Sequence, residues 1–526
     1  MVATLAAGGG ALAGCSSGSK KPKIDTRKIK LPSYLPYTAV KPDLPGTAQG
    51  VMQAFFAYPA SPGRAVKAVP GQGGPVTALV PALGPQLLNP GTNGHWKEIN
   101  QRLGVTLRVS GANGTEYTTK VQTTIAGGDL PDMMQLAGLP QLPQLLKAKF
   151  ADLSEYLAGD AIKDYPMLAA IPTAAWRTTA VNGGIYGVPE TQAPVPGNVI
   201  VRTDMFEAAG VEPKFDNAKE FLSVCQALSS SRHHTWAWGQ DPASNLVPVV
   251  QQMLGVPNGW KLDGGKLTSA LEAPETKKAI DFVAGMWKKE LIHPDSIANP
   301  VEYPTWFDGK VIAMTTGALA SWKVRLAAIV AAGLPPLTCN AILLPKFDGG
   351  GVASYWMGAV SRGMTSLKKA DPKRIREMLR ILDWMAAPFG TEEYLLKTYG
   401  VPNRNYTMKG SDPTPILNHE ELMYFVGYLT NPAEVLYTPG AADLVKRQHE
   451  LQEQIIPAAL PNPVDGLLSD TQLTTGAQLS KKIQDAMTDI ITGRKPLSTW
   501  DGVVKDWKSG GGDAIAREYE AALATR

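Results

Sequence analysis

The sequence has few of the patterns that carry enzyme chemistry. It has six histidines, and in the one adjacent pair, His233 and His234, the two rings diverge on a helix or a strand. No HExxH, CxxC or GxxxxGK[ST] pattern is present. These absences argue against a catalytic zinc site and a phosphate-binding loop. No catalytic residue and no transition-metal site is expected.

Charge and hydropathy exclude two further kinds of partner. Lys and Arg number 51 and Asp and Glu 47, so the net charge is +4, and no basic block or stripe stands out. Nucleic-acid binding is therefore not expected. No apolar run approaches the roughly 18 residues that span a bilayer. The N-terminus is therefore the one place where an association with the membrane is considered.

Cysteine is scarce, with Cys15, Cys225 and Cys339 alone in the chain. Cys225 lies on the apolar face of a helix predicted in DNAKEFLSVCQALSS, and Cys339 lies in LTCNAILLP, which is typical of a buried strand. Both are expected to be core thiols, because free Cys packs as a small hydrophobic side chain. A disulfide between them stays open as the alternative. Cys15 has no core-like periodicity around it.

No cofactor is expected, and calcium is the one ion that the sequence leaves open. The segment KLDGGKL (261–267) and the pair Asp465 and Asp470 each hold some calcium-ligand chemistry. Neither has the alternating oxygen ligands and the final Glu of a 12-residue calcium loop.

The chain of 526 residues is long enough for two or more lobes. Residues 16–75 are rich in Ser, Pro and Gly without sustained periodicity, which predicts a tether leading into irregular structure. From residue 75 onward helical and strand patterns alternate, which favours an α/β fold with a mostly parallel sheet. A later helix is predicted over 370–388, with Asp371 as N-cap and Pro372 at its first position.

Aromatic residues are the more informative class. Several of the 12 tryptophans stand beside small or polar residues, as in EYPTWFDG, GALASWK and ASYWMGA. One face of a sugar ring carries C–H groups that pack flat on an indole, while its hydroxyl groups need polar partners. A saccharide cleft is therefore one interpretation of these segments. The alternative is that most of these tryptophans fill the core.

Two sets of motifs resemble one known family. Leu12-Ala13-Gly14-Cys15 resembles the lipobox that ends a lipoprotein signal peptide, although Met1–Gly14 lacks the usual Lys or Arg. Five further segments resemble, in the same order, an extracellular solute-binding lipoprotein of a bacterial ABC importer, of the saccharide-binding type that includes maltose- and alginate-binding proteins. These segments are IAGGDLPDMMQLAG (125–138), NGGIYGVPE (182–190), NVIVRTDMFEAAGVEP (198–213), EYPTWFDGKVIAMTTGALASW (302–322) and ITGRKPLSTWDGVVKDWKSGGGDAIAREYEAA (491–522).

The resemblance implies a two-lobed α/β fold of the periplasmic-binding-protein type, class II topology, with a ligand cleft between the lobes. Crossings between the lobes are expected near Glu190 and Met357. The implied parts are a signal peptide (1–14), a lipidated Cys15 with a flexible tether (15–75), an N-terminal lobe (76–190 and 358–400) and a C-terminal lobe (191–357 and 401–526).

The resemblance also implies ligand-binding positions. Trp322 matches the aromatic residue that stacks on sugar in the maltose-binding type, whereas Ala137 is a poor ligand group. Arg202 and Asp204 have the alternative role of structural caps for the helix that follows. The candidate ligand contacts are Trp322, Trp356, Tyr355, Glu190, Gln192, Gln135, Trp306 and Arg202.

The implied function is that of a receptor rather than an enzyme. We expect a monomer on the outer face of the cell membrane, anchored through lipid on Cys15, which closes its lobes on a saccharide and delivers it to the ABC importer permease. The alternative is a secreted lipoprotein enzyme that cleaves polysaccharide with two carboxylates, for which Glu190 and Asp308 are the candidates.

Overall fold

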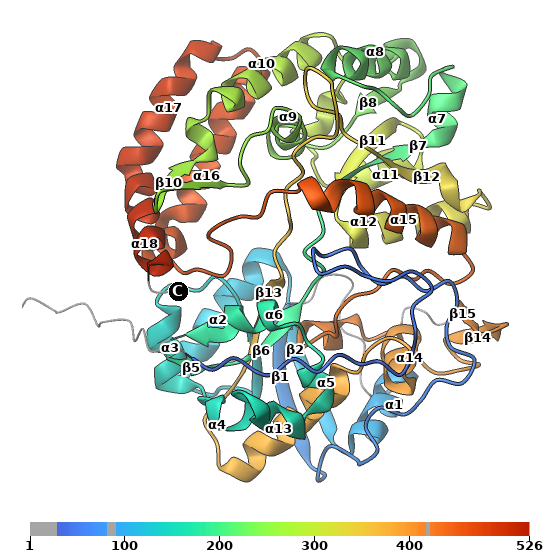
Figure 1. The fold of residues 1–526 in the computed structure, drawn as a ribbon, viewed down its shortest axis with the longest axis vertical. Helices are drawn as coiled ribbons and strands as arrows, with labels where there is room; N and C mark the ends of the chain where they lie inside the picture. Colours follow the sequence, from blue (N-terminus) through green and yellow to red (C-terminus); the bar gives the residue numbers. More distant parts are fainter. Residues whose placement is uncertain (1–28, 82–90, 182, 417–420, 525–526) are drawn as a thin grey trace, which may run out of the picture.

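Two mixed sheets form the centres of two lobes, one above the other in Figure 1. The computed structural model describes residues 29–81, 91–181, 183–416 and 421–524. The first sheet has the strand order β2–β1–β3–β13–β6 and the second β12–β7–β11–β8. The first-sheet strands are β1 (Pro75–Pro81), β2 (Thr106–Ala112), β3 (Met133–Leu136), β6 (Val188–Thr191) and β13 (Ser361–Leu367). The second-sheet strands are β7 (Asn198–Arg202), β8 (Trp236–Trp238), β11 (Ile312–Gly317) and β12 (Cys339–Ile342).

The chain passes from one lobe to the other, and this explains why the sheets are mixed rather than mostly parallel as expected. β7 follows directly from the first sheet and enters the second from the interlobe side, so it runs antiparallel to β11 and β12. β13 returns in the same way and runs antiparallel to β3 and β6. The remaining pairs β1–β2, β1–β3 and β8–β11 are parallel. The insertion of the returning strand β13 between β3 and β6 agrees with the class II topology that the motifs imply.

Helices cover both sheets. In the first lobe they are α1 (Gly94–Leu103), α2 (Gly114–Gly127), α3 (Leu142–Lys149), α4 (Ser154–Leu157), α5 (Pro166–Ala169), α6 (Thr173–Trp176), α13 (Pro372–Met385) and α14 (Glu392–Tyr399). In the second they are α7 (Thr203–Ala208), α8 (Ala218–Leu228), α9 (Val247–Met253), α10 (Pro274–Lys288), α11 (Tyr303–Asp308), α12 (Leu319–Ala331), α15 (Ala442–Ile455), α16 (Asp470–Ile491), α17 (Trp500–Trp507) and α18 (Asp513–Leu523). The predicted cap of α13 is confirmed, because the Asp371 side chain accepts from the Arg374 amide. Hairpins β4 (Ala180–Val181) with β5 (Gly184–Ile185), β9 (Trp260–Asp263) with β10 (Lys266–Ser269), and β14 (Tyr406–Lys409) with β15 (Asp412–Pro415) complete the fold.

Three crossings join the two lobes, at 192–197, 343–360 and 430–441. The first two lie near the expected positions. The third lies about 30 residues later than the expected boundary at 400, because Met423, Val426 and Leu429 still pack in the first-lobe core. Residues 401–429 therefore belong to the first lobe, which corrects their assignment to the second.

The segment that precedes β1 is packed onto the folded lobes, which corrects the expectation of a flexible tether as far as residues 31–74 are concerned. Its backbone is irregular, but Met52, Ala54 and Tyr58 are buried. Side chains distant in sequence hold its amides: Glu393 accepts from Ala65 and Val66. The predicted signal peptide, Cys15 and the residues up to 28 lie outside the described part of the chain.

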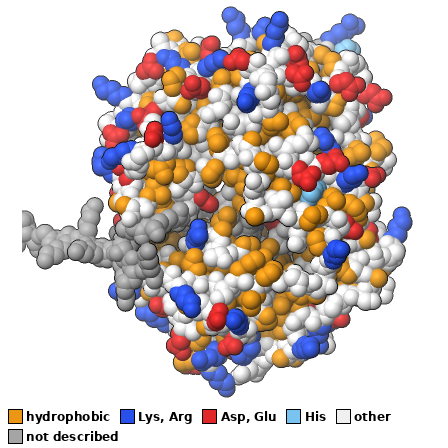
Figure 2. Space-filling view, in the orientation of Figure 1, with side chains coloured by type: hydrophobic (Ala, Val, Ile, Leu, Met, Phe, Trp, Pro, Cys, Tyr) orange, Lys and Arg blue, Asp and Glu red, His pale blue; other side chains and the backbone are white. Residues whose placement is uncertain are grey.

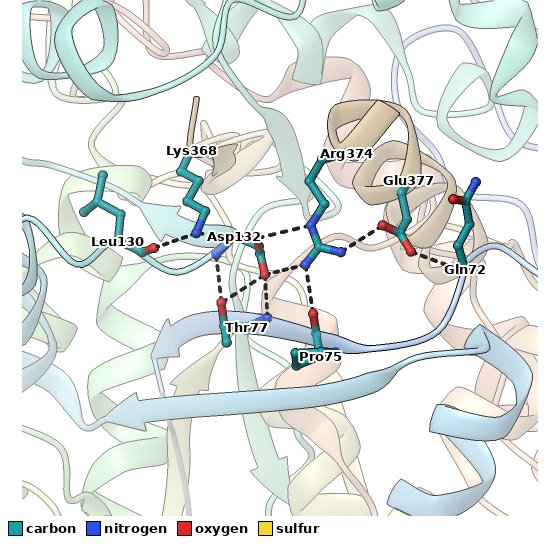
Figure 3. Close-up of polar contacts among 8 residues, drawn as sticks. All are labelled: Gln72, Pro75, Thr77, Leu130, Asp132, Lys368, Arg374 and Glu377. Atoms are coloured by element: carbon teal, nitrogen blue, oxygen red, sulfur yellow. Dashed lines mark hydrogen bonds and ion pairs between the residues drawn. The ribbon is translucent and has the colours of Figure 1, made fainter. Parts of the chain in front are cut away.

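An ion-pair network closes the edge of the first sheet that is remote from the second lobe (Figure 3). Asp132 accepts from the Thr77 amide and hydroxyl at 2.9 and 3.0 Å and from Arg374 Nη2 at 2.8 Å. Arg374 also donates to Glu377 and to the Pro75 carbonyl. Burial raises the pKa of Asp132, but the hydrogen bonds from Arg374 and Thr77 outweigh burial and leave that pKa below its usual value. The network joins β1, the turn before β3 and α13.

We expect Asp132→Asn to lower the free energy of unfolding by about 2 kcal/mol at pH 7, because charge-assisted hydrogen bonds to a buried carboxylate are lost. The folded pKa of Asp132 lies below the unfolded one, so this stabilisation is present above about pH 4 and is lost as the pH falls further. Urea denaturation at pH 7 and pH 3 should show the difference between variant and parent shrinking at pH 3. Asn at the exposed position Asp129 serves as the control; a pH-independent difference for Asp132→Asn would contradict the account.

Candidate functional site

The strand ends place one edge of each sheet at the interface between the lobes. In the first sheet this edge carries Thr191 and its partner Ser361, and in the second it carries Asn198 and its partner Gly317. Polar side chains at these edges therefore lie on the two walls of the interlobe space, and the surface is hollowed where the lobes meet (Figure 2). Binding sites in two-lobed α/β proteins are concave spaces of this kind.

The first wall holds a buried carboxylate beneath a half-exposed cation. Gln135 on β3 donates from Nε2 to Glu190 Oε2 on β6 at 3.0 Å, and Arg362 Nη1 lies 3.3 Å from Glu190 Oε1. Glu190 is 1% exposed, whereas 38% of the Arg362 side chain is exposed. A Cβ at Gly363 would lie 2.6 Å from the Leu136 carbonyl oxygen and 2.7 Å from Gln135 Nε2, so this close approach to the β3 backbone requires glycine. The structure thus brings the predicted Gln135 and Glu190 together, and Arg362, which sequence reasoning missed, covers them.

Burial controls the charge of this wall. It raises the pKa of Glu190 to about 7, although Arg362 and the Gln135 amide both act to lower it. Burial and the Glu190 carboxylate together raise the pKa of Tyr428, and the charge of Arg362 acts to lower it. The wall therefore gains negative charge as the pH rises through neutrality.

The second wall is formed by polar side chains directly after β8 and at the end of β11. Gln240 accepts from the Thr316 amide at 2.6 Å and donates to the Thr316 carbonyl at 3.1 Å. The Thr316 hydroxyl lies 3.4 Å from Asn245 Oδ1. Sequence reasoning missed these residues; the signal was present as WGQD, in which two polar residues follow a buried strand.

A cavity of about 410 Å³ lies in the second lobe beside the second crossing. Trp356 and Trp507 contribute indole rings to its lining, and Ser244, Gln251 and Gln484 contribute polar groups. Trp356 is fixed by a 2.8 Å hydrogen bond from its Nε1 to the Val256 carbonyl. Of the predicted aromatic contacts, Trp356 is the one that lines this cavity.

Two of the predicted aromatic contacts lie in the core instead. Trp322 is 1% exposed, and its Nε1 donates to the Cys339 carbonyl at 2.9 Å. Tyr355 is fully buried, and its hydroxyl accepts from the Leu344 amide. Neither ring offers a free face to a ligand in this structure, because the second-lobe core encloses both.

Trp306 and Arg202 lie at the edge of the second sheet that is remote from the first lobe. Trp306 on α11 stacks on the His293 ring, with centroids 3.9 Å apart. Arg202 is 1% exposed and donates to the Asp204 carboxylate and to the Phe307 and Asp308 carbonyls. Its donors are thus engaged within the fold; Arg202 occupies the N-cap position of α7 but makes no side-chain cap hydrogen bond, so it is structural without being the expected cap.

Gln192 joins two crossings rather than pointing at a ligand. Its side chain donates to the Ala359 carbonyl at 3.0 Å, and its amide donates to the Val360 carbonyl. The third crossing lies against the first in turn, because the Thr191 hydroxyl donates to the Asn431 carbonyl. The three crossings therefore lie side by side.

The two described thiols are confirmed as core residues. Cys225 and Cys339 are both fully buried and free, so the disulfide alternative is wrong. Burial raises the pKa of each thiol. Within the described ranges, no group of three or more His, Cys, Asp or Glu side chains is placed to hold a metal ion, and none of the helices is both long and apolar enough to span a membrane.

Two lobes joined by adjacent crossings, with polar walls facing one another, define a two-lobed binding protein. The sequence profile of the bacterial extracellular solute-binding proteins matches residues 96–414. The chain belongs to that family.

The relatives fit this assignment. The chain is similar to lipoprotein LipO of Bacillus subtilis, with 22% identity over 80% of this chain and 87% of the relative. It is also similar to the polygalacturonan/rhamnogalacturonan-binding protein YtcQ of the same organism, at 22% identity over 81% of this chain and 87% of the relative. Among solved structures, alginate-binding protein AlgQ2 has a TM-score of 0.62 at 15% identity and covers 86% of this chain and 97% of its own. A solute-binding protein from Bifidobacterium longum infantis, described as HMO-binding, has a TM-score of 0.63 at 14% identity, covering 86% and 98%.

We expect Trp322→Ala to lower the free energy of unfolding by about 3–5 kcal/mol, because truncating a fully buried Trp leaves a cavity. Urea denaturation followed by circular dichroism measures the loss. Trp306→Ala, at a partly exposed ring, should cost less. An unchanged unfolding midpoint for Trp322→Ala would show that the core does not depend on this ring.

We expect Glu190→Gln to change how stability depends on pH. Because the folded pKa of about 7 lies above the unfolded value of about 4.5, the native protein binds an extra proton between these values and loses stability as the pH rises through that window. The stability of the Gln variant relative to the parent should therefore increase by about 1–3 kcal/mol from pH 5 to pH 8. Glu212→Gln, at an exposed carboxylate, is the control; equal pH profiles for the parent and Glu190→Gln would contradict burial of an ionisable group.

Proposed function

We propose that the chain is a lipid-anchored extracellular receptor that binds an oligosaccharide between its lobes and delivers it to an ABC importer. The observation that carries the proposal is the cavity beside the second crossing, in which indole rings and polar side chains line the same space. Trp356 and Trp507 offer apolar faces to sugar C–H groups, and Ser244 and Gln484 line the same cavity with hydroxyl and amide groups that suit sugar hydroxyls. The similarity to proteins named for binding polygalacturonan, rhamnogalacturonan and alginate supports a saccharide ligand.

Lobe closure supplies the mechanism, and no bond is made or broken. A ligand that contacts both walls binds the closed form more tightly than the open one and shifts the population toward closure. The shift equals the difference in its affinity for the two forms, so contacts to a single wall contribute nothing to it. The permease would recognise the two lobe surfaces in their closed arrangement.

The anchor rests on the sequence. Cys15 follows Leu-Ala-Gly in LAGCSS, and the similar protein LipO is named a lipoprotein. An acylated Cys15 would hold a monomeric receptor at the extracytoplasmic face of the membrane, where the permease lies. No cofactor enters the proposed mechanism.

The enzyme alternative loses its candidate residues. A glycosidase needs two carboxyl groups roughly 5–10 Å apart across the scissile bond. Glu190 lies at the interlobe edge of the first sheet, whereas Asp308 ends α11 at the remote edge of the second and pairs with Arg325 at 2.6 Å. These two carboxylates do not face one another, which favours binding without turnover.

A panel of neutral and acidic oligosaccharides tests the proposal. Thermal unfolding is followed with each sugar in excess, because a ligand that binds only the native state raises its unfolding temperature. We expect a rise with at least one oligosaccharide and no release of shorter products on prolonged incubation. A lack of any shift across neutral and uronate oligomers would contradict the saccharide ligand, and product formation would support the enzyme instead.

We expect Trp356→Ala to raise the dissociation constant for that oligosaccharide at least about tenfold, which corresponds to about 1.4 kcal/mol, because a sugar-stacking face is removed. Isothermal titration calorimetry measures the change. Trp306→Ala is the matched control, because its ring lies in the same lobe but at the remote edge. Equal affinity losses for the two variants would mean that Trp356 does not contact the ligand.

A further inference from the structure

A hairpin formed by residues 43–58, here called the N-terminal clip, reaches from the first lobe to the second and back. Its two arms pair through Leu44 and Ala54, and the turn between them is closed by the Thr47 amide donating to the Val51 carbonyl. The chain before it is held on the first lobe, where the Leu35 amide donates to the Ala169 carbonyl. The clip therefore adds two chain passages between the lobes to the three crossings that join them.

The tip of the clip is fastened to α15 of the second lobe. The Met52 amide donates to Gln452 Oε1 at 2.9 Å, and Gln452 Nε2 lies 3.5 Å from the Met52 sulfur. His449 Nε2 lies 3.0 Å from the Pro45 carbonyl oxygen. Val51, Met52 and Ala54 are part of the second-lobe core. Both the backbone and the side chains of the tip are thus bound to this lobe.

The base of the clip is fastened to the first lobe. The rings of Phe55 and Tyr58 lie 4.4 and 4.9 Å from the Phe389 ring, between centroids. The Tyr58 hydroxyl donates to the Thr391 carbonyl, and the Tyr58 amide donates to Asp412 Oδ1 at 2.8 Å. The change from second-lobe to first-lobe contacts occurs between Ala54 and Phe55, which are adjacent residues.

At that point the clip pairs with the third crossing. The Phe55 amide donates to the Leu436 carbonyl at 2.9 Å, and the Leu436 amide donates to the Gln53 carbonyl at 2.8 Å. Asp412 secures both chains, because it also accepts from the Tyr437 hydroxyl and the Gly440 amide. Clip and crossing form a two-chain ribbon at the boundary between the lobes. Opening of the lobes must bend this ribbon or release the clip at one of its ends.

We propose that the N-terminal clip limits how far the lobes open in the absence of ligand. A single crossing can hinge through a few backbone torsions, whereas a ribbon that is packed on both sides resists the same motion. The ligand-free receptor thereby opens less widely, so the free-energy cost of closing it around a ligand is smaller. The proposal does not depend on the chemical identity of the ligand.

Spin labels on the two lobes test the proposal in the ligand-free full chain. Lys149→Cys and Lys288→Cys place labels on exposed positions of the first and second lobes. Cys15→Ser removes the native cysteine that lies outside the described residues, and the other two, Cys225 and Cys339, are buried. Pulsed electron spin resonance then gives the distribution of interlobe distances. One variant replaces residues 46–52 with Asn-Gly, which keeps both arms and removes the tip. A second variant, Gln452→Leu, removes the side-chain acceptor that binds the Met52 amide at the tip. Gln454→Leu, on the exposed face of α15, is its control.

We expect the shortened clip to broaden the distance distribution and lengthen its mean by several ångströms, and Gln452→Leu to do so to a smaller extent, with Gln454→Leu equal to the parent. A distribution unchanged in the folded shortened variant would overturn the proposal. If the shortened variant does not fold, the interlobe distances of Gln452→Leu test the proposal instead. Amide hydrogen exchange of residues 44–54 in the same variant is the second measurement. Faster exchange with unchanged interlobe distances, or unchanged exchange, would overturn the fastening role assigned to Gln452. Because no ligand is used, this result is independent of the saccharide test.

Discussion

The direction in which the chain enters each sheet is the constraint on which the rest of the structure depends. β7 and β13 start at the interlobe edge because they follow crossings, and their antiparallel pairing fixes which end of every neighbouring strand faces the other lobe. Polar residues at those ends, such as Glu190 and Thr316, become walls of one space, while residues at the opposite ends, such as Arg202 and Asp132, become structural. The same chemical groups therefore have different roles according to their position along a strand.

Buried carboxylates and amides are the second recurring element. Glu393, Asp412 and Gln452 each accept from backbone amides of the irregular segment before β1. An irregular segment cannot satisfy its own amides, and a buried amide without an acceptor costs a substantial part of a hydrogen bond. These side chains supply that acceptor, and in doing so they hold the segment before β1 on the lobes.

Local sequence signals predicted the individual elements well. Asp371 and Pro372 marked the start of α13, and the apolar pattern around Cys225 predicted a buried helix. The family motifs gave the two lobes and the first two crossings. Long-range contacts account for what the sequence did not predict. Trp322 and Trp356 stand in similar local contexts, and only packing against the Cys339 strand makes the first a core residue. The clip carries no periodic signal, because the side chains that fasten it to the two lobes, Asp412 and Gln452, lie more than 300 residues away in sequence.

Ligand binding is expected to bring two rigid lobes together around adjacent crossings. Small-angle X-ray scattering of the receptor, alone and saturated with the oligosaccharide that raises its unfolding temperature most, tests this claim most directly. We predict a smaller radius of gyration in the saturated receptor and an unchanged profile in the presence of a sugar that does not bind. The same radius of gyration with and without a bound ligand would contradict closure of the lobes on the ligand.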